Sequence, residues 1–400
     1  MVSGIWVVAG RHLDTVGGVR TATRITPRSP LRDERTAAVL GIALGVTFSI
    51  CFATGLLSHL VQDPGGWFHW PARPAGLYRV TQGVHITTGI VSIPLLLAKL
   101  WAVFPKLFEW PPARSVAHAL ERLALLPLIG GGLLLVFTGL ANINIYRPWA
   151  FSFRPGHYAA AWVVMGAMAV HIGAKIHTTR QALGRHPAEA IEAPSAASPR
   201  GGLDRRGFLT TVFGAAGLVG VLSVGQTVEP LARLVVLAPR RPDIGPQGFP
   251  VNRTARSVAL EEVDLDAYRL VIDGPAVRRQ LSLTYADLLA APQHTASLPI
   301  ACVEGWSSSQ RWRGVRVRDL LDRAGVDSSA ESVVYAMHES ERLRTAPLSA
   351  AHANDADTLL ALYVNDEPLA PDHGFPVRLI GPNRPGVHQT KWVGRIEVVG

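Results

Sequence analysis

The sequence predicts two structural halves. The first is an N-terminal all-α transmembrane bundle of four helices plus a fifth signal or anchor helix, and the second is a C-terminal α+β domain rich in β-strands. Three observations support this prediction: five long runs lack Asp, Glu, Lys and Arg, acidic residues become frequent after Glu229, and short alternating segments typical of strands follow. With 400 residues, 48% hydrophobic and 17% charged, the composition lies between that of a soluble protein and that of a membrane bundle.

The five uncharged runs are each close to the length that crosses a bilayer, which is about 20 residues for a helix. They cover Thr36–Gln62, Val80–Ala98, Leu123–Tyr146, Gly156–Ala174 and Gly207–Val228. Basic residues gather before the first run, between the second and third, and between the fourth and fifth, so these three segments are expected in the cytoplasm. We therefore expect a multi-pass protein of the cell membrane, in contact with lipid, whose C-terminal domain lies on the extracytoplasmic side.

The expected domain boundaries follow from these runs. Residues 1–35 form a basic cytoplasmic N-terminus, 36–185 the four-helix domain, 186–203 a flexible linker rich in Ala, Pro, Ser and Gly, 204–229 the fifth helix and 230–400 the exported domain. The net charge of +9 comes largely from arginines between the apolar runs, where membrane topology explains them. No nucleic-acid partner is expected.

The segment Asp204-Arg205-Arg206-Gly207-Phe208-Leu209, directly before the fifth run, is similar to a twin-arginine export signal. Such a signal is read by the twin-arginine translocation machinery, which moves folded, cofactor-loaded domains. The alternative is that Arg205 and Arg206 only anchor the helix on the cytoplasmic side.

Histidines within the apolar runs are candidate ligands, because polar groups in lipid are costly and usually functional. His85 and His157 lie fourteen and eighteen residues from Lys99 and Lys175, which places them at depths that differ by about 6 Å. We expect this pair to hold the iron of an outer haem through two imidazoles. The alternative for any one of them is a histidine bonded to a helix carbonyl.

Two further histidines leave the haem count open. His171 lies fourteen residues from His157 on the same helix face, about 21 Å deeper, and could serve an inner haem. His118 is the nearest candidate for its partner. His59, at the outer end of the first run, could compete with His157 as a ligand.

On these features, residues 36–180 resemble the four-helix b-type cytochromes that serve membrane hydrogenases and formate dehydrogenases. The resemblance implies one or two haem b groups and electron exchange with the quinone pool. The chain departs from that pattern because no histidine lies near the cytoplasmic end of its first helix.

The C-terminal half is expected to contain strands at Tyr268–Ile272 and Arg395–Val399 and helices at Thr284–Ala290 and Val317–Ala324. It also contains Cys302, one of only two cysteines in the chain, in the segment Ala301-Cys302-Val303-Glu304-Gly305-Trp306. A lone cysteine is often just a small buried hydrophobic residue.

This segment, however, resembles the metal-binding cysteine loop of the sulfite-oxidase superfamily, especially the branch of periplasmic reductases that repair methionine sulfoxide. Two other segments are similar to the opening and closing parts of that family's domain: Tyr268–Gly274, and His373–Arg378 followed by Lys391-Trp392-Val393 and Arg395-Ile396. The resemblance covers about residues 249–400.

The resemblance implies a molybdenum–molybdopterin cofactor with Cys302 as the thiolate ligand of the metal and the catalytic centre. It also implies that Asn252, His373, Arg378 and Lys391 bind the cofactor, and guanidinium and ammonium groups do suit an anionic dithiolene phosphate. His388 stands where sulfite oxidases usually have an arginine, which argues against anion binding of their kind.

The expected function is oxygen-atom transfer by a membrane-bound molybdenum oxidoreductase, most naturally the reduction of a sulfoxide-type group on a small molecule or a protein. Electrons would be exchanged with the quinone pool through haem b. One alternative is a sulfite-oxidising enzyme that passes electrons to the membrane. The other is a non-enzymatic electron-transfer subunit whose C-terminal domain docks a partner.

Overall fold

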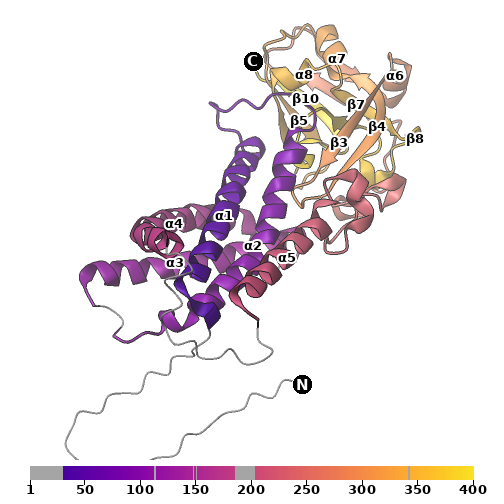
Figure 1. Cartoon of the computed structure of the whole chain (residues 1–400). Helices are drawn as coiled ribbons and strands as arrows, with labels where there is room; N and C mark the ends of the chain where they lie inside the picture. The colour runs from indigo at the N-terminus through magenta and orange to yellow at the C-terminus, as the bar shows by residue number, and fades with distance from the viewer. Residues whose placement is uncertain (1–29, 112–113, 147, 150, 185–202, 341–342) are drawn as a thin grey trace, which may run out of the picture.

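The computed structural model describes residues 30–111, 114–146, 148–149, 151–184, 203–340 and 343–400. The basic N-terminus before residue 30 and nearly all of the expected linker at 186–203 lie outside the described residues. Within the described part, a bundle of long helices is followed by a sheet-containing domain that sits on one end of the bundle (Figure 1). We call this the domain-facing end.

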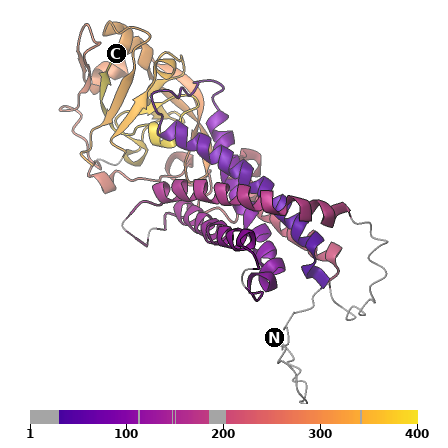
Figure 2. The same ribbon diagram turned by 90° about the vertical axis from the view of Figure 1, so that its left-hand side faces the viewer.

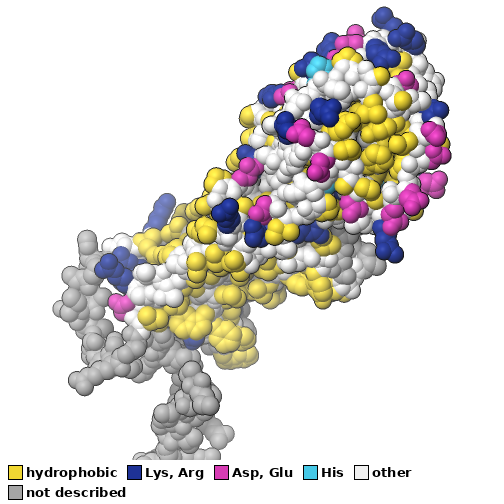
Figure 3. All heavy atoms as spheres, turned by 90° about the vertical axis from the view of Figure 1, so that its right-hand side faces the viewer, with side chains coloured by type: hydrophobic (Ala, Val, Ile, Leu, Met, Phe, Trp, Pro, Cys, Tyr) yellow, Lys and Arg dark blue, Asp and Glu magenta, His cyan; other side chains and the backbone are white. Residues whose placement is uncertain are grey.

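The bundle consists of five helices that are long and apolar enough to cross a membrane. They are α1 (Glu34–Gln62), α2 (Leu77–Leu107), α3 (Val116–Ile143), α4 (Phe153–Gly184) and α5 (Arg205–Val224). α1 packs along α2, α3 along α4, and α5 lies against α2 (Figure 2). Apolar side chains cover the bundle face in Figure 3, whereas charged ones gather over the C-terminal domain.

Short polar side chains fix where several of these helices begin. The side chains of Asp33, Ser115 and Asp204 each accept a hydrogen bond from a backbone N–H three residues ahead, at the starts of α1, α3 and α5. Arg205 and Arg206 therefore occupy the first turn of α5, at the end remote from the C-terminal domain (Figure 1).

The fifth uncharged run was expected to extend to Val228, but α5 ends at Val224. A Cβ on Gly225 would lie 2.2 Å from the carbonyl oxygen of Leu231, so the chain turns tightly there into the short helix η3 (Glu229–Leu234). A lack of charge marks apolar surroundings, not the last hydrogen-bonded turn of a helix.

The C-terminal domain contains two sheets of five strands each. The first has the order β2 (Leu281–Leu283), β1 (Leu270–Asp273), β10 (Val393–Val398), β5 (Ser332–Ala336) and β6 (Thr345–Leu348). The second has the order β3 (His294–Ala301), β4 (Ser307–Arg316), β7 (Leu359–Val364) and β8 (Glu367–Pro368), with β9 (Arg378–Ile380) also paired to β7. The short helices α6 (Tyr285–Ala290), α7 (Val317–Arg323) and α8 (Ala350–Ala353) connect strands.

The expected strands and helices of this domain are confirmed with small shifts at their ends. β1 and β10, which are far apart in the sequence, pair in parallel with Ile272 opposite Ile396. Gly274 follows β1 with φ +122°, and a Cβ there would lie 2.3 Å from the Val398 carbonyl oxygen. Only glycine fits this turn, because any other side chain would clash with the end of β10 and would disfavour the positive φ.

Polar contacts join the domain to the bundle where α1 ends and α2 begins. Asn383 accepts a hydrogen bond from the Tyr78 backbone N–H through its side-chain oxygen at 2.7 Å, and its carbonyl accepts one from Trp70 Nε1 at 2.8 Å. Arg73 reaches across to Asp355 and Asp357. These contacts position the domain's second sheet over the bundle.

Candidate active site

The cysteine loop, residues 302–306, joins β3 to β4. These strands form an antiparallel hairpin in which Ala301 is opposite Ser307, so the loop closes the hairpin directly. Cys302 N donates to the Trp306 carbonyl at 2.9 Å, and Gly305 N donates to the Cys302 carbonyl at 3.0 Å. Gly305 adopts φ +102°, which favours glycine. The hairpin thus holds Cys302 in a fixed position at the end of β3, an outer strand of the second sheet.

The sulfur of Cys302 is buried and has polar neighbours. Asn252 Nδ2 lies 3.6 Å from Sγ and donates to it. Burial, and then the nearby Glu304 carboxylate, raise the pKa of the thiol to about 12, although the Asn252 hydrogen bond and Arg240 act in the opposite direction. A thiolate at this position therefore needs a cation at the sulfur, as a metal ion would provide.

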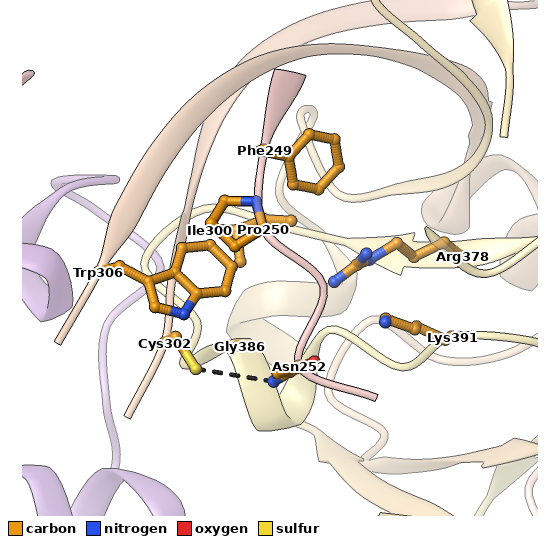
Figure 4. A pocket seen from close by; sticks show the side chains of 9 residues that line it. All are labelled: Phe249, Pro250, Asn252, Ile300, Cys302, Trp306, Arg378, Gly386 and Lys391. Atoms are coloured by element: carbon orange, nitrogen blue, oxygen red, sulfur yellow. Dashed lines mark hydrogen bonds between the residues drawn. The ribbon is translucent and has the colours of Figure 1, made fainter. Parts of the chain in front are cut away.

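A cavity opens beside Cys302 and encloses about 260 Å³ free of protein atoms, including its opening to solvent. Arg378 and Lys391 point toward this space from the side opposite Cys302 and Asn252 (Figure 4). The other lining residues are Phe249, Pro250, Ile300, Trp306 and Gly386. The cavity thus brings together four of the five residues expected at the cofactor.

Arg378 begins β9 and is 3% exposed. Its NH1 donates to the His373 carbonyl at 3.1 Å, but among the described residues its buried Nε has no hydrogen-bond partner. Burial lowers the pKa of the guanidinium to about 9, while Cys302 acts to raise it. A buried cation with a spare donor facing a cavity fits an anionic ligand.

Lys391 supplies a second buried cation beside Arg378. Its Nζ donates to the carbonyls of Arg253 and Asp372 at 2.8 and 2.6 Å. Burial, and then repulsion from Arg378, lower the pKa of Lys391 well below its ordinary value. The two side chains approach closely because Gly374 lies between them: a Cβ there would be 3.0 Å from Lys391 Cβ and 3.3 Å from Arg378 Cβ. An anion in the cavity would relieve this repulsion.

His373 lies behind Arg378 and does not line the cavity. Its ring stacks on Phe249 at 3.7 Å, and its Nε2 donates to the Pro246 carbonyl at 2.8 Å. Burial, then the charge of Arg378, lower the pKa of the imidazole to about 3. Cofactor binding by His373 stays a prediction; in the structure its ring packs on Phe249 and its carbonyl accepts a hydrogen bond from Arg378.

His388 also lies away from the cavity, at the contact with the bundle. Its Nε2 donates to the Gln62 carbonyl at the end of α1 at 3.0 Å. The buried Arg384 beside it donates to the carbonyls of His388 and Pro347. This buried pair, which the sequence did not single out as a structural contact, joins the catalytic domain to α1.

In the bundle, His85 on α2 and His157 on α4 come together, with ring centres 6.3 Å apart. Two imidazoles on opposite sides of one metal ion have centres about 6 Å apart, since each metal–nitrogen bond is about 2 Å. His85 Nδ1 donates to the Cys51 carbonyl at 2.8 Å. His157 Nδ1 lies 2.8 Å from the Thr138 hydroxyl, which itself donates to Leu134. Both rings therefore keep Nε2 as a free lone pair, the state of a metal-binding histidine.

The other bundle histidines have different surroundings. His171 lies among the charged side chains of Lys99, Lys175 and Glu121, and within the described residues its buried Nδ1 has no hydrogen-bond partner. His118 Nδ1 accepts from the Arg114 backbone at the start of α3. His59 stacks on Tyr158 at 3.9 Å and turns Nδ1 toward Asp63.

The cysteine loop rests directly on the helices at the domain-facing end. Gln82 Nε2, one turn before His85 on α2, donates to the Val303 carbonyl at 3.0 Å. After α5, the Gln226 carbonyl accepts from Ser307 N at 2.7 Å, and the Thr227 hydroxyl donates to the Gly305 carbonyl at 3.1 Å. The candidate metal ligand and the paired histidines are therefore linked by a short, rigid contact.

Comparison with known proteins identifies a family for the part of the chain that forms the cavity. Residues 257–400, which include Cys302, Arg378 and Lys391, match the family described as oxidoreductase molybdopterin binding domain. The uncharacterized oxidoreductase YuiH of Bacillus subtilis is 34% identical over 151 residues, which are 37% of this chain and 73% of YuiH. The chain belongs to the molybdopterin-binding oxidoreductase family. It is an oxidoreductase, and its family implies a molybdenum cofactor.

Other relatives of this molybdopterin oxidoreductase match over a smaller share of their own length. Mitochondrial sulfite oxidase of Rattus norvegicus is 31% identical over 175 residues, and the chain spans about a third of it, 32%. Nitrate reductase [NAD(P)H] of Hordeum vulgare is 40% identical over 103 residues, 24% of this chain and 12% of that protein. Among solved structures, the sulfane dehydrogenase SoxCD from Paracoccus pantotrophus matches with a TM-score of 0.32 and 26% identity, over 35% of this chain and 40% of that one.

The residues around the cavity fit a molybdopterin cofactor. The buried Cys302 offers a soft sulfur ligand, and the buried donors of Arg378 and Lys391 face the same space. Sequence reasoning found these residues but missed Phe249, Ile300 and Trp306, which shape the cavity. They are core residues, whose apolar side chains carry no local chemical signal.

Proposed function

We propose that this protein is a membrane-bound molybdenum oxidoreductase that reduces a sulfoxide-type group with electrons taken from the quinone pool through haem b in its own helical bundle. The observation that carries the proposal is the contact between the cysteine loop and the helix bearing His85. It joins a molybdenum-type cavity and a haem-type histidine pair within one chain.

In this proposal the five apolar helices span the cell membrane, and the C-terminal domain lies on its extracytoplasmic side. The support is the distribution of basic residues, with Arg205 and Arg206 in the first turn of α5, far from the C-terminal domain. α5 would act as the twin-arginine signal that delivers the folded, cofactor-loaded domain. Cofactor insertion before export explains why a translocation machinery for folded domains is needed.

In the cavity, Cys302 would bind the metal, and Asn252 would donate a hydrogen bond to its sulfur. Arg378 and Lys391 would bind the anionic part of the pterin. When bound, the molybdenum centre supplies oxygen-atom transfer coupled to a two-electron redox change. Trp306 and Phe249 give the cavity apolar walls, and the His373 carbonyl accepts a hydrogen bond from Arg378. In the reaction, a sulfoxide, two electrons and two protons are converted to a sulfide and water.

In the bundle, His85 and His157 would hold a haem b at the domain-facing end, and the tautomers fixed by Cys51 and Thr138 leave both Nε2 atoms ready for iron. When bound, the haem supplies one-electron transfer between membrane and cavity. We keep one haem in the proposal. His171 is surrounded by charged side chains, and the described residues offer it no facing histidine contact.

A sulfite-oxidising activity that delivers electrons to the membrane is the second candidate, because sulfite oxidases are among the relatives. The position of His388 weighs against it, since this residue contacts α1 rather than the cavity.

The deciding experiment uses the full-length protein purified from membranes. Metal analysis should find one molybdenum per chain, and the dithionite-reduced spectrum should show one low-spin b-type haem. Methyl sulfoxides added to the reduced protein should then oxidise the haem. If sulfite reduces the oxidised haem and sulfoxides do nothing, the direction of the proposed reaction is wrong; absence of molybdenum would overturn the proposal altogether.

A further inference from the structure

A row of aromatic side chains lies on the surface that α1 and α4 form near the domain-facing end. The ring of His59 stacks on Tyr158 at 3.9 Å and an angle of 19°. Tyr158 contacts Trp162 edge to face at 6.3 Å, and Trp162 contacts Phe52 at 4.9 Å. Trp162 remains 48% exposed. The row therefore runs from a titratable ring near the domain-facing end into the apolar length of the bundle.

Charged groups cap this row at its end nearest the C-terminal domain. Asp63 Oδ2 lies 3.8 Å from His59 Nδ1 and 3.0 Å from Arg154 NH2. The side chains of Asp63 and Arg154 are 46% and 55% exposed, and exposed pairs of this kind contribute little to stability. A polar, proton-accepting group thus lies at one end of an exposed apolar surface.

The row lies next to the paired histidines. Tyr158 directly follows His157 in α4. On α1, Gly55 lies one turn before His59, and a Cβ at Gly55 would be 2.6 Å from His85 Cε1. His59 itself turns its ring against Tyr158 and its Nδ1 toward Asp63.

We propose that this surface, made by His59, Asp63, Tyr158 and Trp162, binds an isoprenoid quinol and oxidises it, with His59 and Asp63 accepting its protons. The inference rests on the proposed function, because it specifies where the electrons enter. The chemistry suits such a ligand: the flat dihydroxy ring matches the aromatic stack, its hydroxyls match the imidazole and carboxylate, and its isoprenoid tail matches the apolar surface that continues along Trp162 and Phe52.

The step balances without any further reactant. Both O–H bonds of the quinol break, two carbonyls form, and two protons pass to His59 and Asp63 and from there to the solvent at the exposed carboxylate. A haem b held by His85 and His157 would accept the two electrons one at a time. They equal the two electrons that one sulfoxide consumes.

The test compares three variants of the full-length protein in lipid nanodiscs. His59→Phe keeps a stacking ring but removes the proton acceptor, and Asp63→Asn keeps the shape but removes the charge. His177→Phe is the matched control, because this histidine is exposed on α4 at the opposite end of the bundle and bonds to Gln181. Haem reduction by a short-chain ubiquinol or menaquinol is followed by absorption. Dithionite is then added to give the total amount of reducible haem.

We expect His59→Phe and Asp63→Asn to slow quinol-driven haem reduction at least tenfold, with an unchanged dithionite spectrum and unchanged oxidation of reduced haem by sulfoxide. His177→Phe should behave as the unaltered protein. Independently of turnover, an azidoquinone should photolabel peptides that contain Tyr158 or Trp162, and excess quinol should compete.

Two outcomes overturn this inference alone: wild-type quinol rates in His59→Phe, or labelling confined to other helices while the haem is present. Loss of the haem spectrum in His59→Phe would also overturn it and make His59 a ligand. If the unaltered protein lacks haem, the proposed function fails with it.

Discussion

Gln82 Nε2 donates a 3.0 Å hydrogen bond to the carbonyl of Val303, the residue after the candidate molybdenum ligand Cys302. Gln82 lies three residues before His85, about 4.5 Å along the helix axis. On the same face of α2, Ile86 lies close to Gly305, since a Cβ on that glycine would be 3.1 Å from Ile86 Cγ1. The loop and the histidine helix are therefore in direct contact, so the proposed electron transfer between them would need no movement of the domain.

This contact predicts that Gln82→Leu slows electron transfer between the bundle and the catalytic domain. Leucine keeps the helix and most of the volume but leaves the Val303 carbonyl and the Ser58 hydroxyl without this partner, at a cost of about 1–3 kcal/mol. Haem reduction by quinol should stay normal, while its reoxidation by sulfoxide slows about tenfold in stopped-flow absorption. Gln181→Leu, at the far end of α4, is the control. Equal slowing of both half-reactions would point to general damage instead.

Cys302→Ser should abolish turnover and leave the haem spectrum intact. A serine hydroxyl is a harder and far more basic ligand than a thiol, so it does not replace the thiolate at a soft metal. Molybdenum content and sulfoxide reduction are measured on the same preparation. Cys51→Ser is the matched control, and it should keep activity. Turnover at the normal rate in Cys302→Ser would exclude the assigned metal ligand.

His85→Ala or His157→Ala should each remove the low-spin b-type spectrum, because each leaves the iron with one axial imidazole. The ring centres are 6.3 Å apart, and both Nδ1 atoms are engaged in hydrogen bonds. His171→Ala should leave the spectrum of the domain-facing haem unchanged. The haem content is measured by the dithionite-reduced minus oxidised spectrum and by a haem stain. A retained bis-imidazole spectrum in both His85→Ala and His157→Ala would show that the pairing is wrong.

Replacing Arg205 and Arg206 by lysine keeps the charge at the start of α5. A simple cytoplasmic anchor should still orient the helix normally. A signal read by a receptor should fail, because lysine lacks the planar guanidinium fork. Protease accessibility of residues 230–400 in intact cells measures the result, and we expect the domain of the double variant to remain inside. Normal export would leave only the anchor interpretation.

Two buried histidines predict acid sensitivity of the catalytic domain. Burial, and then the charge of Arg384, lower the pKa of both His352 and His388 to about 3. The unfolded chain binds these protons near pH 6.5, so their stabilising effect is present above about 6.5 and is lost as the pH falls toward 3. Each contributes a slope of about 1.4 kcal/mol per pH unit in that window.

The melting temperature of the full-length protein should therefore fall between pH 7 and pH 5. His388→Gln keeps a donor for the Gln62 carbonyl but does not titrate, so its melting temperature should depend less on pH. His69→Gln, an exposed change in the loop between α1 and α2, should leave the dependence unaltered. Parallel pH curves for all three proteins would mean that other groups control the acid response.

Much of this fold could be predicted from the sequence because its signals are local. Uncharged runs define the five helices, and counting residues from Lys99 and Lys175 was enough to place His85 level with His157. Cys302, Arg378 and Lys391 were predicted because their segments carry side chains with recognisable chemistry, and all three line one cavity. His373 was placed at the cofactor for the same reason, but its local motif does not reveal that its ring packs on Phe249 behind Arg378.

The contacts between the halves could not be predicted in this way. Gln82 with Val303, Asn383 with Tyr78, and His388 with Gln62 join residues more than 200 positions apart. Their side chains are ordinary polar groups that follow no periodic pattern. Only the way in which the domain is seated on the bundle gives them partners.

The contacts of the backbone beyond α5 bear on whether an export signal in this helix can be removed. Ser307, 2% exposed, donates its N–H to the Gln226 carbonyl, and Thr227 bonds to Gly305. A signal peptidase that cut after Thr227 would detach these partners from the catalytic domain and leave a buried N–H beside the cysteine loop without its acceptor. If α5 is the export signal, the domain therefore keeps both contacts only when the chain is not cut beyond Gln226. An uncut signal would remain as a permanent part of the wall that supports the metal loop, and the purified protein should migrate as one chain that contains both the bundle and the catalytic domain.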